Sequence, residues 1–139
     1  MEFSNPTYEY QVSLRVTHPV LTPDSFTAAL NLDPKTSWSV GDPCKDRHGS
    51  LASGKREESH WLHSFEEKKD GDLPSFLSHV TSRLAAHQDF FHKISSSGGR
   101  AELLVGFFID APNSSIPLTP GLLGRCSELG LHIYIDIYS

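Results

Sequence analysis

The sequence predicts an α+β domain with a mainly antiparallel sheet and helices packed on one face. Residues 8–17 and 131–138 alternate between apolar and polar side chains, as strands with one buried and one solvated face do. Over 73–94, apolar residues recur at three- and four-residue spacing, which is typical of an amphipathic helix. The predicted elements follow the order β-α-β-β-α-β-α-β. This is an elaborated ferredoxin-like arrangement, in which an αβ unit is added to the split βαβ order.

A helix follows the first strand. It is predicted to start at Thr22, because threonine is a favoured cap and Pro23 suits the first helical position. The dipeptide that begins at Asp33 contains a proline at 34 and ends this helix, since a residue before proline avoids the helical conformation.

Two short strands are then predicted at 37–40 and 59–66, each built around one tryptophan. The segment between them, 42–59, is rich in Gly, Ser, Lys and Asp and predicts a long, mobile hairpin loop. We therefore expect a flexible N-terminal segment at 1–7 and one domain over 8–139.

The C-terminal half begins with the long helix at 73–94, for which Asp72 is the expected cap. Residues 102–110 are apolar almost throughout, which predicts a central strand covered on both sides. Thr119 precedes a proline and marks a last helix, and Gly130 is its expected C-terminal cap. The final strand, 131–138, alternates with isoleucines pointing inward.

Composition narrows the classes of function. The chain has 139 residues and a formal charge of −5, from seventeen acidic and twelve basic side chains. A net negative charge disfavours nucleic acid, whose phosphates need clustered Lys and Arg, and it is compatible with a basic protein partner. The first residues lack the basic and apolar runs of a signal peptide, and no apolar stretch is long enough to span a bilayer. We expect a soluble, cytoplasmic protein that does not bind membranes.

Motifs of catalysis are missing from the sequence. It contains no G-x-S-x-G elbow, and its Gly-Gly pair follows a helix instead of leading into one, so it does not form a phosphate cradle. We therefore expect no catalytic residues, no cofactor and no enzymatic activity.

One group of residues has zinc-type side chains: Cys44, His48, His60 and His63. His60 and His63 are three residues apart on a predicted strand, however, so they are expected on opposite faces. A metal site is accordingly not predicted.

The outward faces of the first and last strands form the main candidate binding surface. If both strands share the sheet, Arg15 lies on one face with His132, Tyr134, Asp136 and Tyr138. Tyrosines mixed with both signs of charge suit a protein interface. The alternative is an ordinary solvated sheet face, which is common in antiparallel sheets.

A second candidate is a pocket for a small molecule or a metal, placed between the hairpin loop and the long helix. Its expected lining is Trp38, Trp61 and His87. His87 falls on the apolar stripe of the long helix, where a histidine is more often a hydrogen-bonded core residue than a general base.

Several loose motifs along the chain resemble a known family. They are Val12-Ser13-Leu14-Arg15-Val16, Leu21-Thr22-Pro23, Leu30-Asn31-Leu32-Asp33-Pro34, Trp38 with Gly41-Asp42-Pro43, Ser59-His60-Trp61, Leu129-Gly130-Leu131 and Asp136-Ile137-Tyr138. Together they resemble the bacterial domain of unknown function 4279. The resemblance implies a small α+β protein, suspected from genomic association to be an immunity protein that neutralises a cognate toxin by direct contact. It implies no catalytic residues. The sequence does not fix the oligomeric state.

Overall fold

The fold is given by a computed structural model of the chain, which describes residues 8–65 and 71–139. Segment 1–7, expected to be flexible, lies outside the described residues. The elements in chain order are β1 (Tyr8–His18), α1 (Pro23–Leu30), β2 (Thr36–Trp38), β3 (Pro43–Lys45), β4 (Leu51–Lys55), β5 (Ser59–Ser64), α2 (Leu73–Leu84), a 3-10 turn (Ala85–His87), α3 (Gln88–Ser96), β6 (Arg100–Ile109), α4 (Pro120–Leu129) and β7 (Leu131–Tyr138).

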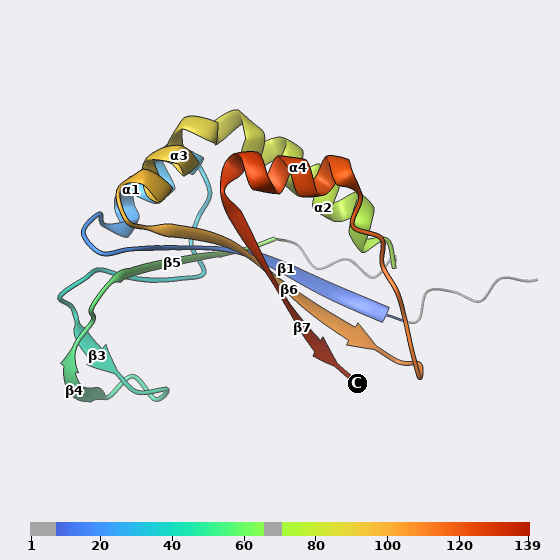
Figure 1. Cartoon of the computed structure of the whole chain (residues 1–139). Helices are drawn as coiled ribbons and strands as arrows, with labels where there is room; N and C mark the ends of the chain where they lie inside the picture. The colour runs from blue at the N-terminus through green and yellow to red at the C-terminus, as the bar shows by residue number, and fades with distance from the viewer. Residues whose placement is uncertain (1–7, 66–70) are drawn as a thin grey trace, which may run out of the picture.

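The main sheet has five strands in the order β2-β5-β1-β6-β7 (Figure 1). β5 lies between β1 and β2 and is antiparallel to both, so the predicted split βαβ arrangement is present. β6 is antiparallel to β1 and parallel to β7, to which α4 connects it. The predicted α+β fold with a mainly antiparallel sheet is therefore confirmed.

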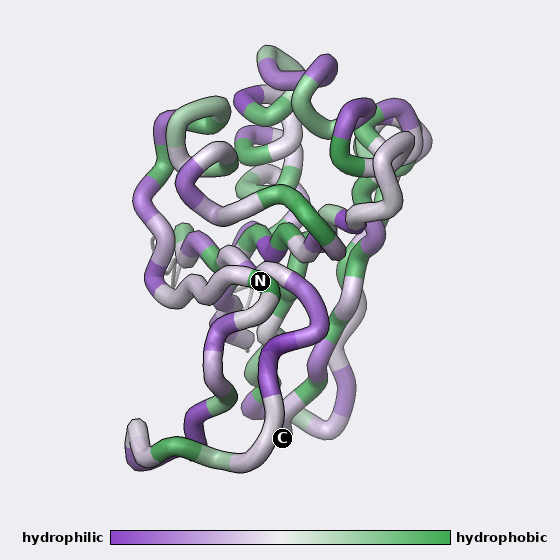
Figure 2. Tube along the Cα trace, turned by 90° about the vertical axis from the view of Figure 1, so that its left-hand side faces the viewer, coloured by the Kyte–Doolittle hydropathy of each residue, from purple (hydrophilic) through white to green (hydrophobic). Residues whose placement is uncertain are grey.

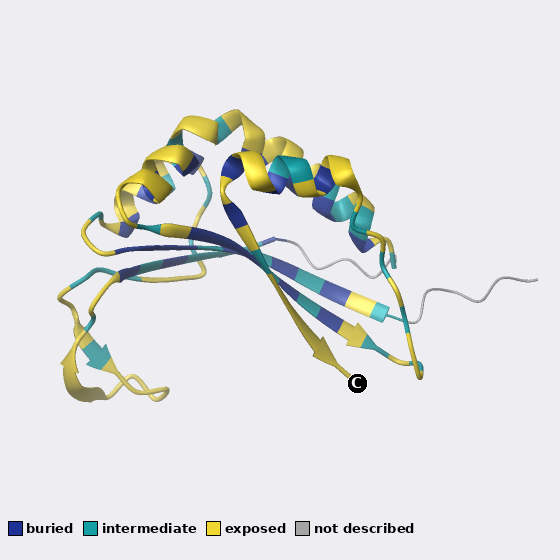
Figure 3. Ribbon diagram, in the orientation of Figure 1, coloured by how far each residue is buried: buried dark blue, intermediate teal, exposed yellow. Residues whose placement is uncertain are grey.

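The helices α1, α2, α3 and α4 all lie on one side of this sheet (Figures 1 and 3). The core fills the space between them and the sheet, and its largest fully buried side chains are Trp61, Tyr10, Phe26 and Phe91. Apolar and polar stretches alternate along the trace, as expected of elements with one buried face (Figure 2). No helix in the described ranges is long and apolar enough to cross a membrane.

The predicted cap residues of α2 and α4 make their capping contacts, whereas Thr22 precedes α1 without a side-chain capping hydrogen bond and α1 ends at Leu30, before the predicted stop at Asp33. The Asp72 carboxylate accepts a hydrogen bond from the Ser75 amide, and the Thr119 hydroxyl accepts one from the Leu122 amide. Gly130 adopts a left-handed conformation (φ 66°) and closes α4.

The long helix predicted over 73–94 is two helices in the structure. α2 ends at Leu84, a 3-10 turn follows, and α3 starts at Gln88. No glycine or proline stands at the break, so the break follows from packing: α2 lies against α4, whereas α3 also contacts β6. The apolar stripe itself is confirmed, because Leu77, Val80, Leu84, Phe91 and Ile94 are buried.

The expectation that β6 is covered on both sides is wrong, because only its helix side is covered within residues 8–65 and 71–139. Its helix-side residues are buried, but on the other side Phe108 is exposed, because no helix among the described residues covers that face. β7 differs in a related way. Leu131 is buried as predicted, whereas Ile135 and Ile137 are exposed because the strand extends past the helices at the edge of the sheet (Figure 3).

Segment 42–59, predicted to be a loop, contains a second, two-stranded sheet. β3 and β4 pair antiparallel and form a hairpin that projects from the side of the main sheet opposite the helices (Figure 1). Two backbone hydrogen bonds close its base, from the Gly41 amide to the Arg56 carbonyl and from the Arg56 amide to the Asp42 carbonyl.

Candidate functional site: the open face of the sheet

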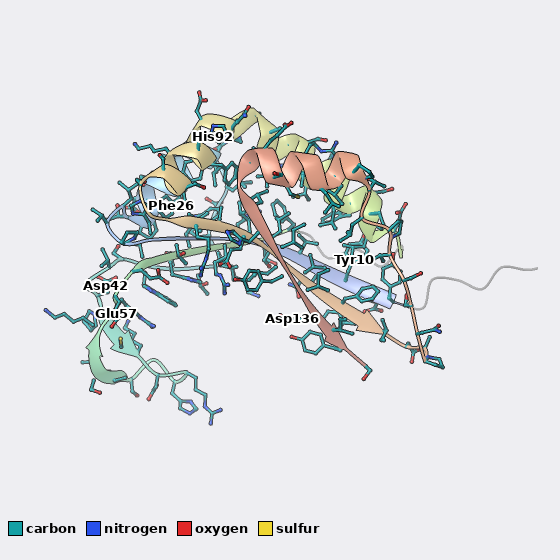
Figure 4. All side chains as sticks on the ribbon, viewed as in Figure 1. Tyr10, Phe26, Asp42, Glu57, His92 and Asp136 are labelled. Carbon is teal, nitrogen blue, oxygen red and sulfur yellow. The ribbon has the colours of Figure 1, made fainter. Side chains whose placement is uncertain are left out.

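The face of the main sheet away from the helices, which we call the open face, gathers the residues expected from the sequence. Strand register places Arg15 beside Glu102 and Glu102 beside His132. The next rows toward the C-terminal end of β7 contain Tyr134, Asp136 and Tyr138. Asp136 lies on this side of the sheet in Figure 4, whereas Tyr10 lies on the helix side. All five predicted interface residues therefore share one face.

At the centre of the open face, Arg15 and Glu102 form an ion pair. The Arg15 Nε donates to Glu102 Oε1 at 2.8 Å, and the Glu102 side chain has no exposed surface. Glu102 Oε2 lies 3.5 Å from Arg100 Nε and has no hydrogen-bond partner among the described residues. Burial raises the pKa of Glu102, but Arg15, the Tyr134 hydroxyl and the charge on Arg100 outweigh it and lower this pKa below its usual value. The carboxylate is thus held charged.

The ion pair is joined to the aromatic residues of β7. The Arg15 guanidinium carbon lies 5.8 Å from the centroid of the Tyr134 ring, within the range of a cation–π contact. Farther along the strands, Phe108 and Tyr138 stack with their ring centroids 4.9 Å apart. The Phe108 ring also leans over Gly106, where a Cβ would come within 3.2 Å of it. These contacts fix aromatic rings that are nonetheless open to solvent, since Tyr134 is 43% and Tyr138 is 52% exposed.

At the opposite edge of the open face, two groups stack on Trp38. The Arg56 guanidinium carbon lies 3.8 Å from the indole centroid, and the His60 ring centroid lies 4.1 Å from it. At these distances the guanidinium and the imidazole would overlap if they lay on the same face of the indole. The indole therefore lies between them. Burial lowers the pKa of His60, and the charges of Arg15 and Arg56 lower it further. The stack connects the β3–β4 hairpin to the main sheet.

An open, solvent-facing cavity of about 620 Å³ lies beside this stack, at the base of the hairpin. Figure 4 shows Asp42 and Glu57 in the same region. The cavity is lined by Pro19, Trp38, Cys44, Lys55, Arg56, Glu57 and Glu58.

The structure separates the three residues expected to form one pocket. Trp61 is fully buried on the helix side, where its indole Nε1 donates to the Thr27 hydroxyl at 3.0 Å. His87 lines a different and much smaller cavity of about 50 Å³. The expectation of a shared pocket is therefore wrong. Trp38 and Trp61 lie on adjacent strands but on opposite faces of the sheet, and only Trp38 lines the cavity at the base of the hairpin.

The zinc-type residues are also apart. His60 stacks on Trp38, whereas His63 points to the helix side, where its Nδ1 donates to the Asp33 carbonyl at 2.6 Å. Cys44 and His48 belong to the hairpin. In the part of the chain that the structure describes, no group of three or more His, Cys, Asp or Glu residues could hold a metal ion.

Three contributors to the open face were missed from the sequence: Glu102, Phe108 and Arg56. Glu102 and Phe108 belong to the apolar run 102–110, which predicts a strand covered on both sides. The acidic residue was the available signal, because a charge inside such a run indicates that one of its faces meets another charge or solvent.

Comparison with known proteins adds one match. Neither the curated proteins nor the solved structures contain a match to this chain. A family model described as "Domain of unknown function (DUF4279)" matches residues 8–139. The chain therefore belongs to the DUF4279 family.

Proposed function

We propose that the chain is a non-catalytic binding protein that contacts a protein partner through the open face of its sheet. The observation that carries this proposal is the group of exposed aromatic side chains on the open face: Tyr134, which contacts Arg15 of the Arg15–Glu102 ion pair, and the stacked Phe108 and Tyr138 farther along the strands. Tyrosine and arginine dominate the energetics of protein interfaces when they are held rigidly and surrounded by complementary contacts.

The proposed residues are held before any partner arrives. Arg15 is tied to Glu102, Tyr134 lies under the Arg15 guanidinium, and Tyr138 is stacked on Phe108. Side chains that are already ordered lose less conformational entropy on binding, so more of the contact energy appears as affinity. This preorganisation favours an interface over an ordinary solvated face.

We infer that the partner is a cognate bacterial toxin and that the chain acts in the cytoplasm as an immunity protein. The inference is supported by the motifs shared with the DUF4279 family and by the net charge of −5, which suits a basic partner. The open face carries both signs of charge. Arg15 and Arg100 lie toward one end of the strands, and Glu9 and Asp136 lie toward the other end. The matching surface on the toxin would then be mixed in charge.

Co-expression tests this role directly. The chain is expressed together with the product of the neighbouring upstream reading frame, and cell survival and complex formation are followed. The proposal predicts rescue from toxicity together with a stable complex. Rescue without a complex, or no toxicity to rescue, would contradict it.

A second candidate function is suggested by the cavity beside Trp38. A concave site with an aromatic wall, an arginine and two acidic residues is suited to a small polar ligand. Trp38 faces this cavity and Trp61 is buried in the core, so fluorescence of the Trp61→Phe variant reports on Trp38 alone. A saturable change with one compound of a ligand screen, absent in Arg56→Ala, would support this candidate over a protein interface.

A further inference from the structure

The outer edge of β7 is an unpaired strand edge eight residues long. β7 is the last strand of the main sheet, and no strand in the described ranges pairs with its outer side. The edge carries exposed apolar side chains, with Ile135 39% and Ile137 65% exposed. Edge strands are usually protected by proline, lysine, a bulge or a covering element, because unpaired N–H and C=O groups recruit other strands. β7 has no proline or lysine, and its register with β6 is regular.

The sequence of this strand is complementary to itself. Residues 132–136 read His-Ile-Tyr-Ile-Asp, which is a palindrome about Tyr134 except that its two ends are a histidine and an acid. In an antiparallel pair of identical strands related by a two-fold axis, residues at equal distances on either side of the axis lie opposite each other. A partner strand centred on the same tyrosine would therefore place each His132 opposite an Asp136 and each Ile133 opposite an Ile135.

We propose that two copies of this chain pair through the outer edges of β7, antiparallel, with the two-fold axis at Tyr134. The pairing joins two five-stranded sheets into one continuous sheet, with the helices of both copies on the same side. It covers the exposed isoleucines on the helix side. On the open face it forms two His132–Asp136 contacts between the copies, in which an imidazole N–H can donate to a carboxylate.

Neighbouring registers fit less well. An axis at Ile133 would place His132 opposite Tyr134, and an axis at Ile135 would place Asp136 opposite Tyr134. Neither register forms the His132–Asp136 contacts. An axis between two residues would put the helix-side isoleucines of one copy opposite the polar open-face residues of the other, because side chains alternate along a strand. An axis at Asp136 would place the two Asp136 carboxylates directly opposite each other, and like charges in that position destabilise the pair. Self-complementarity at Tyr134 is the reason for choosing a second copy over the edge strand of another protein.

Sedimentation equilibrium of the chain alone tests the pairing. The wild-type chain is expected to show a concentration-dependent monomer–dimer equilibrium. His132→Asp puts two acids opposite each other at two places in the dimer and should weaken dimerisation by about tenfold. Asp136→His should also weaken it, and the double variant His132→Asp with Asp136→His should restore it, because the swapped residues again face each other.

A cysteine scan tests the register. In a Cys44→Ser background, Tyr134→Cys places two thiols at the two-fold axis, and mild oxidation should give a covalent dimer. The control, Tyr138→Cys, should stay monomeric, because its two copies would lie about 27 Å apart at a rise of about 3.4 Å per residue.

Three results would overturn the proposal: a wild-type chain that stays monomeric at every concentration, a dimer unaffected by either charge variant, or charge variants not rescued by the swap. The pairing uses His132, Tyr134 and Asp136, which also belong to the proposed partner-binding face, but the two roles are tested separately. The pairing is measured without a partner, so its failure would leave the partner-binding role untouched.

Discussion

Gly99, in the turn from α3 into β6, packs closely against the end of β1. A Cβ at this position would lie 2.6 Å from His18 Cδ2, 2.7 Å from the Thr17 carbonyl oxygen and 2.9 Å from Ile94 Cγ2. The carbonyl belongs to a strand and cannot move without disturbing the sheet. We expect Gly99→Ala to lower the free energy of unfolding by about 1–3 kcal/mol through overpacking, measured by urea denaturation.

Gly124, inside α4, is the matched control for this substitution. A Cβ there meets no atom within 4 Å, so alanine adds helix propensity without a clash. Gly124→Ala should raise the free energy of unfolding by up to about 1 kcal/mol. If both variants changed stability in the same direction, the close approach at Gly99 would not be the cause.

His18 is a second residue with a specific structural role, and it is neutral in the fold. Its Nδ1 accepts hydrogen bonds from the Val20 and Leu21 amides, each at 2.9 Å. Its Nε2 lies 2.8 Å from the Ser97 hydroxyl, which itself donates to the Lys93 carbonyl, so Nε2 must carry the proton and donate. A proton added to Nδ1 would point at two N–H groups. Burial lowers the pKa of His18.

Because this pKa is lower in the folded chain than in the unfolded chain, the unfolded state takes up a proton first as the pH falls. Stability should therefore be full above about pH 6.5, the ordinary value for histidine, and should decline below it. The pKa of His60 is also lowered, by burial and by the charges of Arg15 and Arg56, so its contribution to the pH dependence has the same sign. His18→Asn retains an acceptor for the two amides but cannot be protonated. Its loss of stability between pH 7 and pH 5 should be smaller than that of the wild type, and an equal loss would contradict the role given to His18.

Among the elements, the buried faces of the strands were predicted best, because the alternation of apolar and polar residues depends only on neighbouring positions in the sequence. The alternation of β1 identified its buried face, and Tyr10, Val12, Leu14 and Val16 are all buried. The same pattern in β7 identified the face but not the burial of Ile135 and Ile137, since alternation does not indicate how far the helices extend over a strand. The break between α2 and α3 was missed for a similar reason, because tertiary packing, and not a local breaker, sets it.

The β3–β4 hairpin is an element whose attachment can be tested. Beyond the backbone bonds at its base, it is held by the stack of Arg56 on Trp38. Arg56→Ala should increase amide hydrogen exchange across 43–55 while leaving exchange in β1 and β6 unchanged, since the core does not depend on this contact. Lys55→Ala is the matched control: its side chain also borders the cavity. Equal exchange in both variants and the wild type would show that the stack does not hold the hairpin.

At the scale of the whole molecule, the candidate site depends on which strands become neighbours. The five residues predicted for the open face do share it, because the alternation within β1 and β7 determined each side and the split βαβ order brought both strands into one sheet. The buried partner of Arg15 could not be predicted from local pattern, because the Arg15–Glu102 contact requires the register between β1 and β6. The expected pocket failed because it combined residues from opposite sides of the sheet.

The central claim is that the open face binds a protein partner. Its most direct test is the affinity of purified variants for the product of the neighbouring upstream reading frame, measured by isothermal titration calorimetry. Tyr134→Ala and Tyr138→Ala should each weaken binding by about sixfold or more, as truncation of an interface anchor typically does, with the unfolding transition preserved. Leu123→Ala, on the exposed surface of α4, is the control and should bind like the wild type. Unchanged affinity in both tyrosine variants would contradict the claim.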